Sequence, residues 1–186
     1  MNRKFMKLPQ TISFVLSFFL LTSCYESLDF DQIDDYVYEP IFTSALTYFS
    51  VSPFQFFNSM GIQENEITHI DDFQAFQRDF VRNSVIKIDF DVQVKNEFDR
   101  NVSITFEFLN NNMEAVYSTI EISVDRNNLT HTFLEEIVIA DNPEILNASF
   151  VRAKATVEDT GTPMDPNDTS EFEFKSSITL YIKSEL

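Results

Sequence analysis

The clearest pattern in the chain is a strict alternation of apolar and polar side chains from residue 86 to residue 94. Its apolar members are Ile86, Ile88, Phe90, Val92 and Val94. A period of two places these side chains on one face of a β-strand. The alternation returns at 102–108 and at 116–124, where Ile120 falls on the apolar parity, and the turn sequences NEFDRN and NNN separate the three runs. We therefore predict a meander of three antiparallel strands, each with one face in water.

Four other segments are typical of strands. Residues 41–51 (IFTSALTYFSV) are β-branched or aromatic on both parities, which predicts a strand buried on both faces. Further strands are expected at 130–139, 148–158 and 172–183.

Two short helices are expected between the strands. Asp71 and Asp72 precede Phe73, Phe76 and Phe80, whose i, i+3, i+7 spacing behind an N-cap favours a helix with one apolar face. Asn142-Pro143-Glu144 predicts a single helical turn. With turn signals about every 10 residues, the chain is predicted to be an all-β, immunoglobulin-like antiparallel sandwich of seven or eight strands.

The first 23 residues have the pattern of a targeting segment. Arg3, Lys4 and Lys7 precede a ten-residue apolar stretch, Ile12 to Leu21. Crossing a bilayer takes about 20 apolar residues, so this stretch is too short for a lasting transmembrane helix. It fits the apolar region of a secretory signal.

Leu21-Thr22-Ser23-Cys24 resembles the lipobox of bacterial lipoproteins. The resemblance implies cleavage between Ser23 and Cys24 and lipid on the Cys24 thiol, with two or more acyl chains needed for stable anchoring. The alternative is an ordinary signal peptide in which the chain's single cysteine is incidental. The predicted organisation is a signal peptide at 1–23, a lipidated tether at 24–39 and a sandwich domain at 40–186.

The residues after Cys24 predict the membrane in which the protein is anchored and the face on which it lies. Tyr25 stands where an Asp favours inner-membrane retention in the enterobacterial sorting rule, so the outer membrane is expected. Surface-exported lipoproteins of Bacteroidota carry a compact acidic run after the Cys, whereas the acids between Glu26 and Glu39 are spread out. The periplasmic face is therefore favoured. A stretch with six acids and no basic residue predicts a self-repelling tether, the alternative being an acidic docking motif.

The net charge and the composition limit the classes of partner that the protein is expected to bind. Residues 1–23 hold three of the 13 basic residues and none of the 30 acidic ones, so the mature chain carries a formal charge of −20. This excludes the basic footprint of a nucleic-acid-binding protein and disfavours anionic lipid surfaces. No disulfide is expected because the one cysteine is lipidated, so the core must stabilise the domain.

Asn96-x-Phe98-x-Arg100, leading into Phe106-x-Phe108-Leu109 and an Asn-rich turn, resembles a group of flavobacterial lipoproteins of uncharacterised function. The resemblance covers about a fifth of the chain. It implies a lipoprotein and a sandwich, and no activity.

The candidate chemistry is sparse. His69 and His131 lack metal-ligand spacing, and we expect both to be structural. With two glycines no Gly-rich phosphate loop is expected, and there is no G-x-S-x-G motif. The loop DTGTPMDPNDTSE is the best candidate for a ligand site, with oxygen donors at Asp159, Asp165, Asn167, Asp168 and Glu171. Such donors suit Ca²⁺, although the spacing is not that of an EF-hand and a plain polar turn is the favoured interpretation.

These observations predict a non-enzymatic interaction or scaffold lipoprotein, without a cofactor, that works beside other envelope proteins at the outer membrane. The first alternative is a Ca²⁺-assisted glycan-binding module that uses the loop at 159–171. The second is a hydrolase with a pair of carboxylates.

Overall fold

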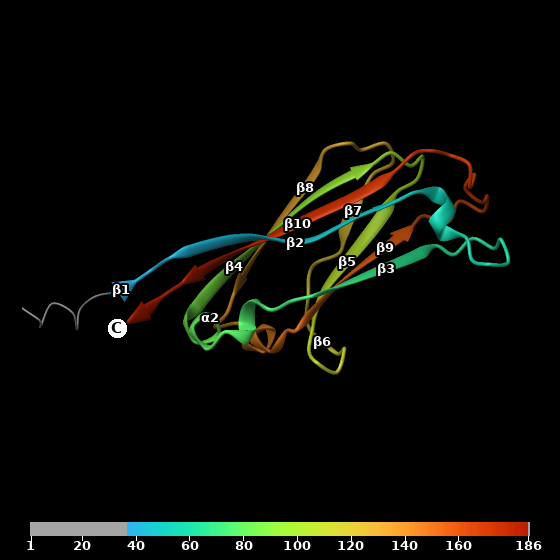
Figure 1. Ribbon diagram of the computed structural model, residues 1–186. Coiled ribbons are helices and arrows are strands. Elements are labelled where there is room, and N and C mark those ends of the chain that lie inside the picture. The colour runs from blue at the N-terminus through green and yellow to red at the C-terminus, as the bar shows by residue number, and fades with distance from the viewer. Residues whose placement is uncertain (1–36, 186) are drawn as a thin grey trace, which may run out of the picture. The chain divides into compact units, whose positions relative to one another are not determined.

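The computed structural model describes residues 37–185 (Figure 1). The predicted signal peptide, the cleavage site at Ser23, the lipidation site at Cys24 and the tether as far as residue 36 lie outside the described residues. The predicted tether's last three residues are described, and two of them form β1 (Val37–Tyr38), which pairs with β11 (Ser184–Glu185).

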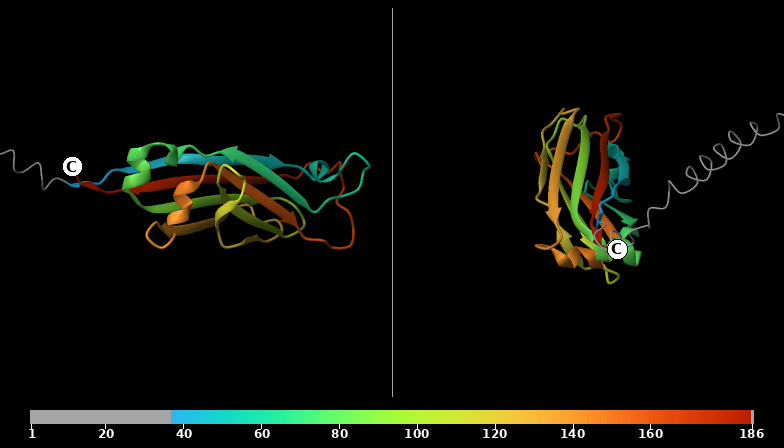
Figure 2. Two further views of the ribbon diagram at one scale, coloured as in Figure 1. Left: turned by 90° about the horizontal axis from the view of Figure 1, so that it is seen from below. Right: turned by 90° about the vertical axis from the view of Figure 1, so that its left-hand side faces the viewer.

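Two antiparallel sheets pack face to face (Figures 1 and 2). The first contains, in spatial order, β2 (Ile41–Val51), β10 (Phe172–Ile182), β4 (Val85–Asn96) and β8 (His131–Val138). The second contains β3 (Glu66–Asp72), β9 (Phe150–Val157), β5 (Val102–Leu109) and β6 (Ala115–Ser118), with β7 (Ile122–Val124) also on β5. The short helices are η2 (Pro53–Phe56), η3 (Ala75–Gln77), α2 (Asp79–Ser84) and η4 (Pro143–Asn147). The predicted all-β antiparallel sandwich is confirmed.

The strand order refines that prediction. When β6 and β7 are counted as one interrupted strand, the first strand of the sandwich pairs with the last, the second with the second last, and so on to the β5–β6 hairpin. This nested pairing is the order of a jelly roll, in which two Greek keys form the two sheets.

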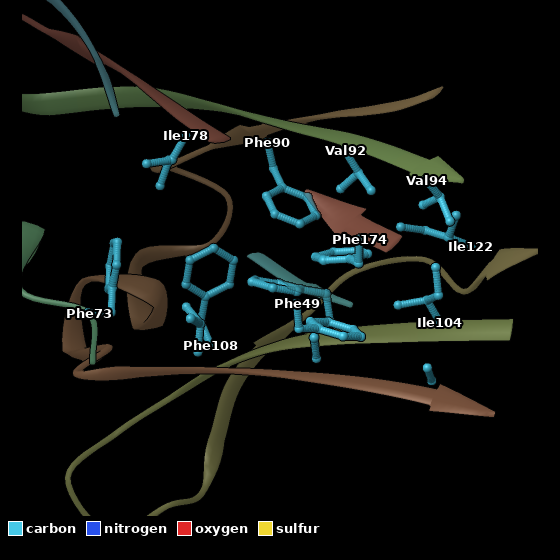
Figure 3. Close-up of a cluster of buried hydrophobic side chains, with 14 of the residues drawn as sticks. Phe49, Phe73, Phe90, Val92, Val94, Ile104, Phe108, Ile122, Phe174 and Ile178 are labelled. Carbon is cyan, nitrogen blue, oxygen red and sulfur yellow. The ribbon is translucent and has the colours of Figure 1, made fainter. Parts of the chain in front are cut away.

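Phenylalanines fill the space between the sheets. The rings of Phe90 and Phe106 have centroids 4.5 Å apart and those of Phe106 and Phe108 are 5.5 Å apart, and all three residues are fully buried. Phe174 and Phe49 stack at 5.2 Å and extend the cluster toward β2 (Figure 3). Edge-to-face and offset rings of this kind add to the stabilisation from apolar burial.

The predicted three-stranded meander is wrong at its first turn. β4 and β5 do not pair with each other, because β4 lies in the four-stranded sheet and β5 in the five-stranded one. The turn at 96–101 therefore carries the chain from one sheet to the other. The second predicted pairing, β5 with the strand at 116–124, is confirmed.

The predicted inward face of the strand at 116–124 is wrong in its first half. The pairing register with β5 shifts by one residue between Ser118 and Ile122, so Ile120 is 70% exposed while Ile122 and Val124 are buried. Glu135 of β8 holds this irregular segment, since it accepts hydrogen bonds from the Tyr117 hydroxyl and, at 3.2 Å, from the Ile120 amide. Burial and the bond to Glu135 raise the pKa of Tyr117.

Three smaller expectations also need correction. β2 is buried on one face and only from Thr47 onward, so the prediction of two buried faces is wrong. Asp71 and Asp72 end β3, a strand that the pattern missed, and do not cap a helix. Phe73 and Phe76 are buried, but a 3₁₀ turn and the one-turn helix α2 replace the expected single helix, and Phe80 is 46% exposed. The helical turn at Pro143 is confirmed as η4.

Candidate functional site

The two ends of the sandwich differ in the loops and short helices that close them (Figure 2). We call the end formed by residues 52–65, 96–101, 125–129 and 158–171 the loop end. We call the end formed by β1, the first residues of β2, residues 73–84 and residues 139–149 the helical end. Each end has one candidate site.

The predicted calcium ligands of the loop at 159–171 do not gather around a common point. Within residues 37–185, no group of three or more acidic, histidine or cysteine side chains has an arrangement that could hold a metal ion. Each predicted aspartate instead accepts the amide two residues further on: Asp159 from Gly161 at 2.8 Å, Asp165 from Asn167 at 2.9 Å and Asp168 from Ser170 at 3.0 Å. These are Asx turns, in which the side chain takes the place of a backbone acceptor.

The two histidines lie in different sheets, each on an edge strand. Nε2 of His69 lies 3.2 Å from Oδ2 of Asp71, and the same oxygen accepts the Thr47 hydroxyl. The carboxylate thus stands between the histidine and the hydroxyl, which is not the order of a nucleophile activated by a histidine base. His131 begins β8 and borders a shallow hollow with Lys95 and Glu173.

Asn96 organises the loop end from within. Its side chain is fully buried, and its Nδ2 donates to the backbone oxygens of Arg100 at 2.9 Å and Asp125 at 3.0 Å. Its Oδ1 accepts the amide of Phe98 at 3.1 Å. One amide side chain therefore joins the turn at 96–101 to the turn at 125–128.

Arg100 is held inside this end, with only 5% of its surface exposed. Its Nη2 donates to the backbone oxygen of Thr162 at 2.5 Å, and its Nε lies 3.6 Å from Oδ1 of the exposed Asp99. Nε and Nη1 are buried and have no hydrogen-bond acceptor among residues 37–185. Buried donors without acceptors are rare in folded proteins, and each one needs an explanation.

Arg100 lines a cavity of about 270 Å³ beneath the loop at 159–171. Asp99, Asp165 and Asp168 also line it, and Pro53 and Met164 supply apolar wall. The sequence pattern pointed to the loop but did not mark Arg100 as a site residue. The available signal was the Asn96-x-Phe98-x-Arg100 motif, whose three named residues are all buried at this end.

Glu97 fastens the far end of the loop. Its Oε2 accepts the amide of Glu171 at 2.9 Å, and its own amide donates to the backbone oxygen of Glu171 at 3.0 Å. The Lys95 ammonium, 2.6 Å from Oε1, and the Glu171 amide lower the pKa of Glu97. The Ser170 amide and hydroxyl similarly lower the pKa of Asp168.

The helical end has an open groove of about 620 Å³ between β2 and the segment at 72–81. Phe42 and Ser44 pair with Leu180 and Ile178 of β10, so these four side chains share the inner face of the sheet and form the floor. Phe73 and Val81 form the opposite wall, and the polar rim consists of Asp72, Gln74, Gln77 and Arg78.

β2 is the edge of its sheet, and it differs from the other edge strands. Its eleven residues include no charge and no proline, whereas β3 and β8 carry acidic residues and β6 is four residues long. Native sheets normally protect their edges with charges, prolines, bulges or very short strands. β2 has one of these devices, a register shift against β10 that leaves Leu46 as an extra residue, and it lacks the other three. Among residues 37–185, no strand pairs with the outer side of β2.

No helix within residues 37–185 combines the length and the apolar character that crossing a membrane requires. No family model and no curated protein matches the chain. Among solved structures, VP2 of infectious bursal disease virus in a subviral particle is 14% identical, with a TM-score of 0.40 over 77% of this chain and 32% of that one. A protein of Parabacteroides distasonis ATCC 8503, described as a candidate secreted protein, is 16% identical, with a TM-score of 0.45 over 62% of this chain and 38% of its own. The chain spans about a third of the length of these matched chains.

Proposed function

We propose that the protein is a lipid-anchored, non-enzymatic interaction protein of the bacterial outer membrane, held on the periplasmic face by lipid on Cys24. In this proposal it binds another envelope protein by accepting an extended segment of that partner along the outer side of β2. The observation that carries the proposal is the uncharged, proline-free edge of β2 beside a groove with a largely apolar floor and a polar rim.

Strand addition uses the main-chain hydrogen-bonding groups on the outer edge of β2. An incoming segment forms main-chain hydrogen bonds with the free edge and places every second side chain on one face of the sheet. On the inner face those side chains meet the groove floored by Phe42 and Leu180. Arg78 at the rim, which has no side-chain partner within residues 37–185, offers a contact to a carboxylate of the segment.

The proposed anchor rests on the lipobox resemblance. Val37, the first described residue, is 13 positions after Cys24. At roughly 3.6 Å per residue, the chain between them spans at most about 47 Å. Lipid on Cys24 therefore confines the sandwich to a layer near the membrane, where its partners are other envelope proteins.

The interaction is tested with a photo-crosslinking amino acid at Ala45, an exposed β2 residue that lines the groove. The full-length protein is expressed at its native level, and crosslinked peptides are mapped. We expect a crosslink to one extended partner segment that disappears when the neighbouring Ser44 is replaced by Lys. Leu134, which is 55% exposed on the opposite edge strand β8, is the matched control position. Equal crosslinking at Ala45 and Leu134, or none at Ala45, contradicts the proposal.

The anchor is tested separately by Cys24→Ser. The variant should accumulate as an unacylated precursor, as measured by mass spectrometry of the membrane and soluble fractions. A mature, acylated product from this variant would rule out Cys24 as the lipidation site.

A further inference from the structure

We propose that the cavity at Arg100 binds a small neutral polyol, such as a single sugar ring. This site is at the opposite end of the sandwich from the β2 groove, and it does not depend on the anchor or on the partner proposed above.

Arg100 has unmet hydrogen-bonding capacity. A guanidinium has five N–H donors in a planar fork, and those on Nε and Nη1 have no acceptor in the described part of the chain. The residue is nevertheless held in place by the Thr162 oxygen and, through its own carbonyl, by Asn96. When the Thr162 contact opens, these unused donors become available to an acceptor that residues 37–185 do not provide.

The charge around the cavity selects the ligand class. Asp99, Asp165 and Asp168 line the cavity together with the single guanidinium. A free anion would face three carboxylates, and a metal cation would face Arg100. A neutral ligand that both donates and accepts hydrogen bonds avoids both costs, and hydroxyl groups have this property.

Specific atoms remain available for such a ligand. Oδ1 of Asp165 accepts the amide and the side-chain nitrogen of Asn167, whereas Oδ2 of Asp165 has no partner within residues 37–185. A ligand hydroxyl can therefore donate to Oδ2 of Asp165 while another accepts from Nη1 of Arg100. Pro53 and Met164 present apolar surface to the C–H face of a ring.

The size of the cavity limits the ligand to one small molecule. Its volume of about 270 Å³ is slightly below the lower limit of about 300 Å³ for typical ligand pockets. Nε and Nη1 are closed to solvent, so a ligand reaches them when residues 160–162 move outward. These residues are exposed, and the bond from Nη2 of Arg100 to the Thr162 oxygen is the contact that such a movement breaks.

The test measures the thermal unfolding and the saturation-transfer NMR spectra of the full-length protein in a detergent without a sugar headgroup. The probes are glucose, galactose, mannose, N-acetylglucosamine and glycerol, with glucuronate and Ca²⁺ as charged probes. We expect at least one neutral probe to bind with a millimolar Kd and to raise the unfolding temperature, while the charged probes have no effect.

Two variants tie the binding to the site. Asp165→Asn keeps the Oδ1 acceptor of the Asx turn and removes the free carboxylate oxygen, so it should fold and bind about tenfold more weakly. Arg100→Gln should abolish binding, and Arg126→Gln, on the neighbouring turn, is the matched control. The proposal is overturned if no neutral probe binds, if a charged probe binds instead, or if Asp165→Asn binds like the unaltered protein.

Discussion

The two ends of the sandwich differ in how they place polar side chains. Apolar side chains are exposed at both ends, for example Phe42 at the helical end and Phe54 at the loop end, and at the helical end Phe42 lines an open groove. At the loop end, polar side chains that normally lie in water, Asn96 and Arg100, are buried. An open groove with an exposed apolar side chain in its lining favours association with other chains, whereas buried, oriented polar groups favour recognition of one small ligand. The two ends are therefore suited to different partners.

The difference has a structural cause. The loop at 158–171 folds back over the turn at 96–101 and is fastened there by Glu97 and by Arg100. At the helical end β2 begins before the five-stranded sheet covers it, so its first five residues are exposed on both faces. One end is closed by a long connection, and the other is left open by an overhanging strand.

The largest expected effect compares two phenylalanines, one at each end. Phe98 is 1% exposed and packs against Phe56 and Phe172 at centroid distances of 6.0 and 6.2 Å, so Phe98→Ala should cost about 4 kcal/mol. Phe80→Ala, at a residue 46% exposed, should cost about 1 kcal/mol or less. Urea denaturation followed by fluorescence or circular dichroism measures both. Similar losses would show that the two ends are equally well packed.

The next effect compares two asparagines that organise turns. Asn96→Ala leaves the Phe98 amide and the carbonyls of Arg100 and Asp125 without their partner in a buried site, so we expect a loss of about 3 kcal/mol. Asn110 makes similar bonds to the amides of Asn112 and Glu114, but it does so in an exposed turn where water can replace them.

Asn110→Ala should therefore cost about 1 kcal/mol or less, by the same denaturation measurement. An equal cost for both substitutions would mean that burial adds nothing to the role of Asn96.

A smaller change in the free energy of unfolding is expected at Arg100, where a substitution should leave the stability nearly unchanged or increase it. Arg100→Met removes two donors without acceptors and one bond to Thr162, so stability should stay within about 1 kcal/mol of the original or increase. Arg126→Met, at an exposed residue of the adjacent turn, should change stability by less than about 0.5 kcal/mol. A loss above about 2 kcal/mol at Arg100 would indicate a structural residue and would weaken the contrast between the ends.

The sequence predicted the strands better than their partners. The alternation at 86–94 marked β4, and the nearly single-parity run at 172–183 marked β10, because one buried face produces a period of two. Alternation carries no information about which strands pair, so β4 and β5 were placed in one meander although they belong to different sheets. The shift at Ile120 was equally hidden, because a single extra residue reverses the parity of the residues after it.

The site at the loop end could not be predicted from the sequence, for a related reason. A charged residue in a turn is normally solvated, and Arg100 is buried only because a loop some 60 positions later in the chain covers it. The aspartates of that loop, which were weak candidates for calcium ligands with a plain polar turn as the favoured interpretation, each replace a backbone acceptor. The sequence around residues 96–101 and 158–171 does not indicate that these two segments contact each other.

The last and smallest effect is a dependence of the loop end on acid pH. The pKa values of Glu97 and Asp168 are lowered in the folded protein, so their ionised forms stabilise it. This contribution is complete above about pH 5 and is lost as the pH falls below about 4, through the lowered pKa values. The protection factors of the amides of residues 158–171, which correct for slower intrinsic exchange in acid, should therefore fall at low pH relative to those of β6 at the other end of β5. Glu97→Gln should lower the protection of the loop at neutral pH and reduce its response to acid. An equal fall in the protection of both segments would show a global loss of stability and not release of the loop.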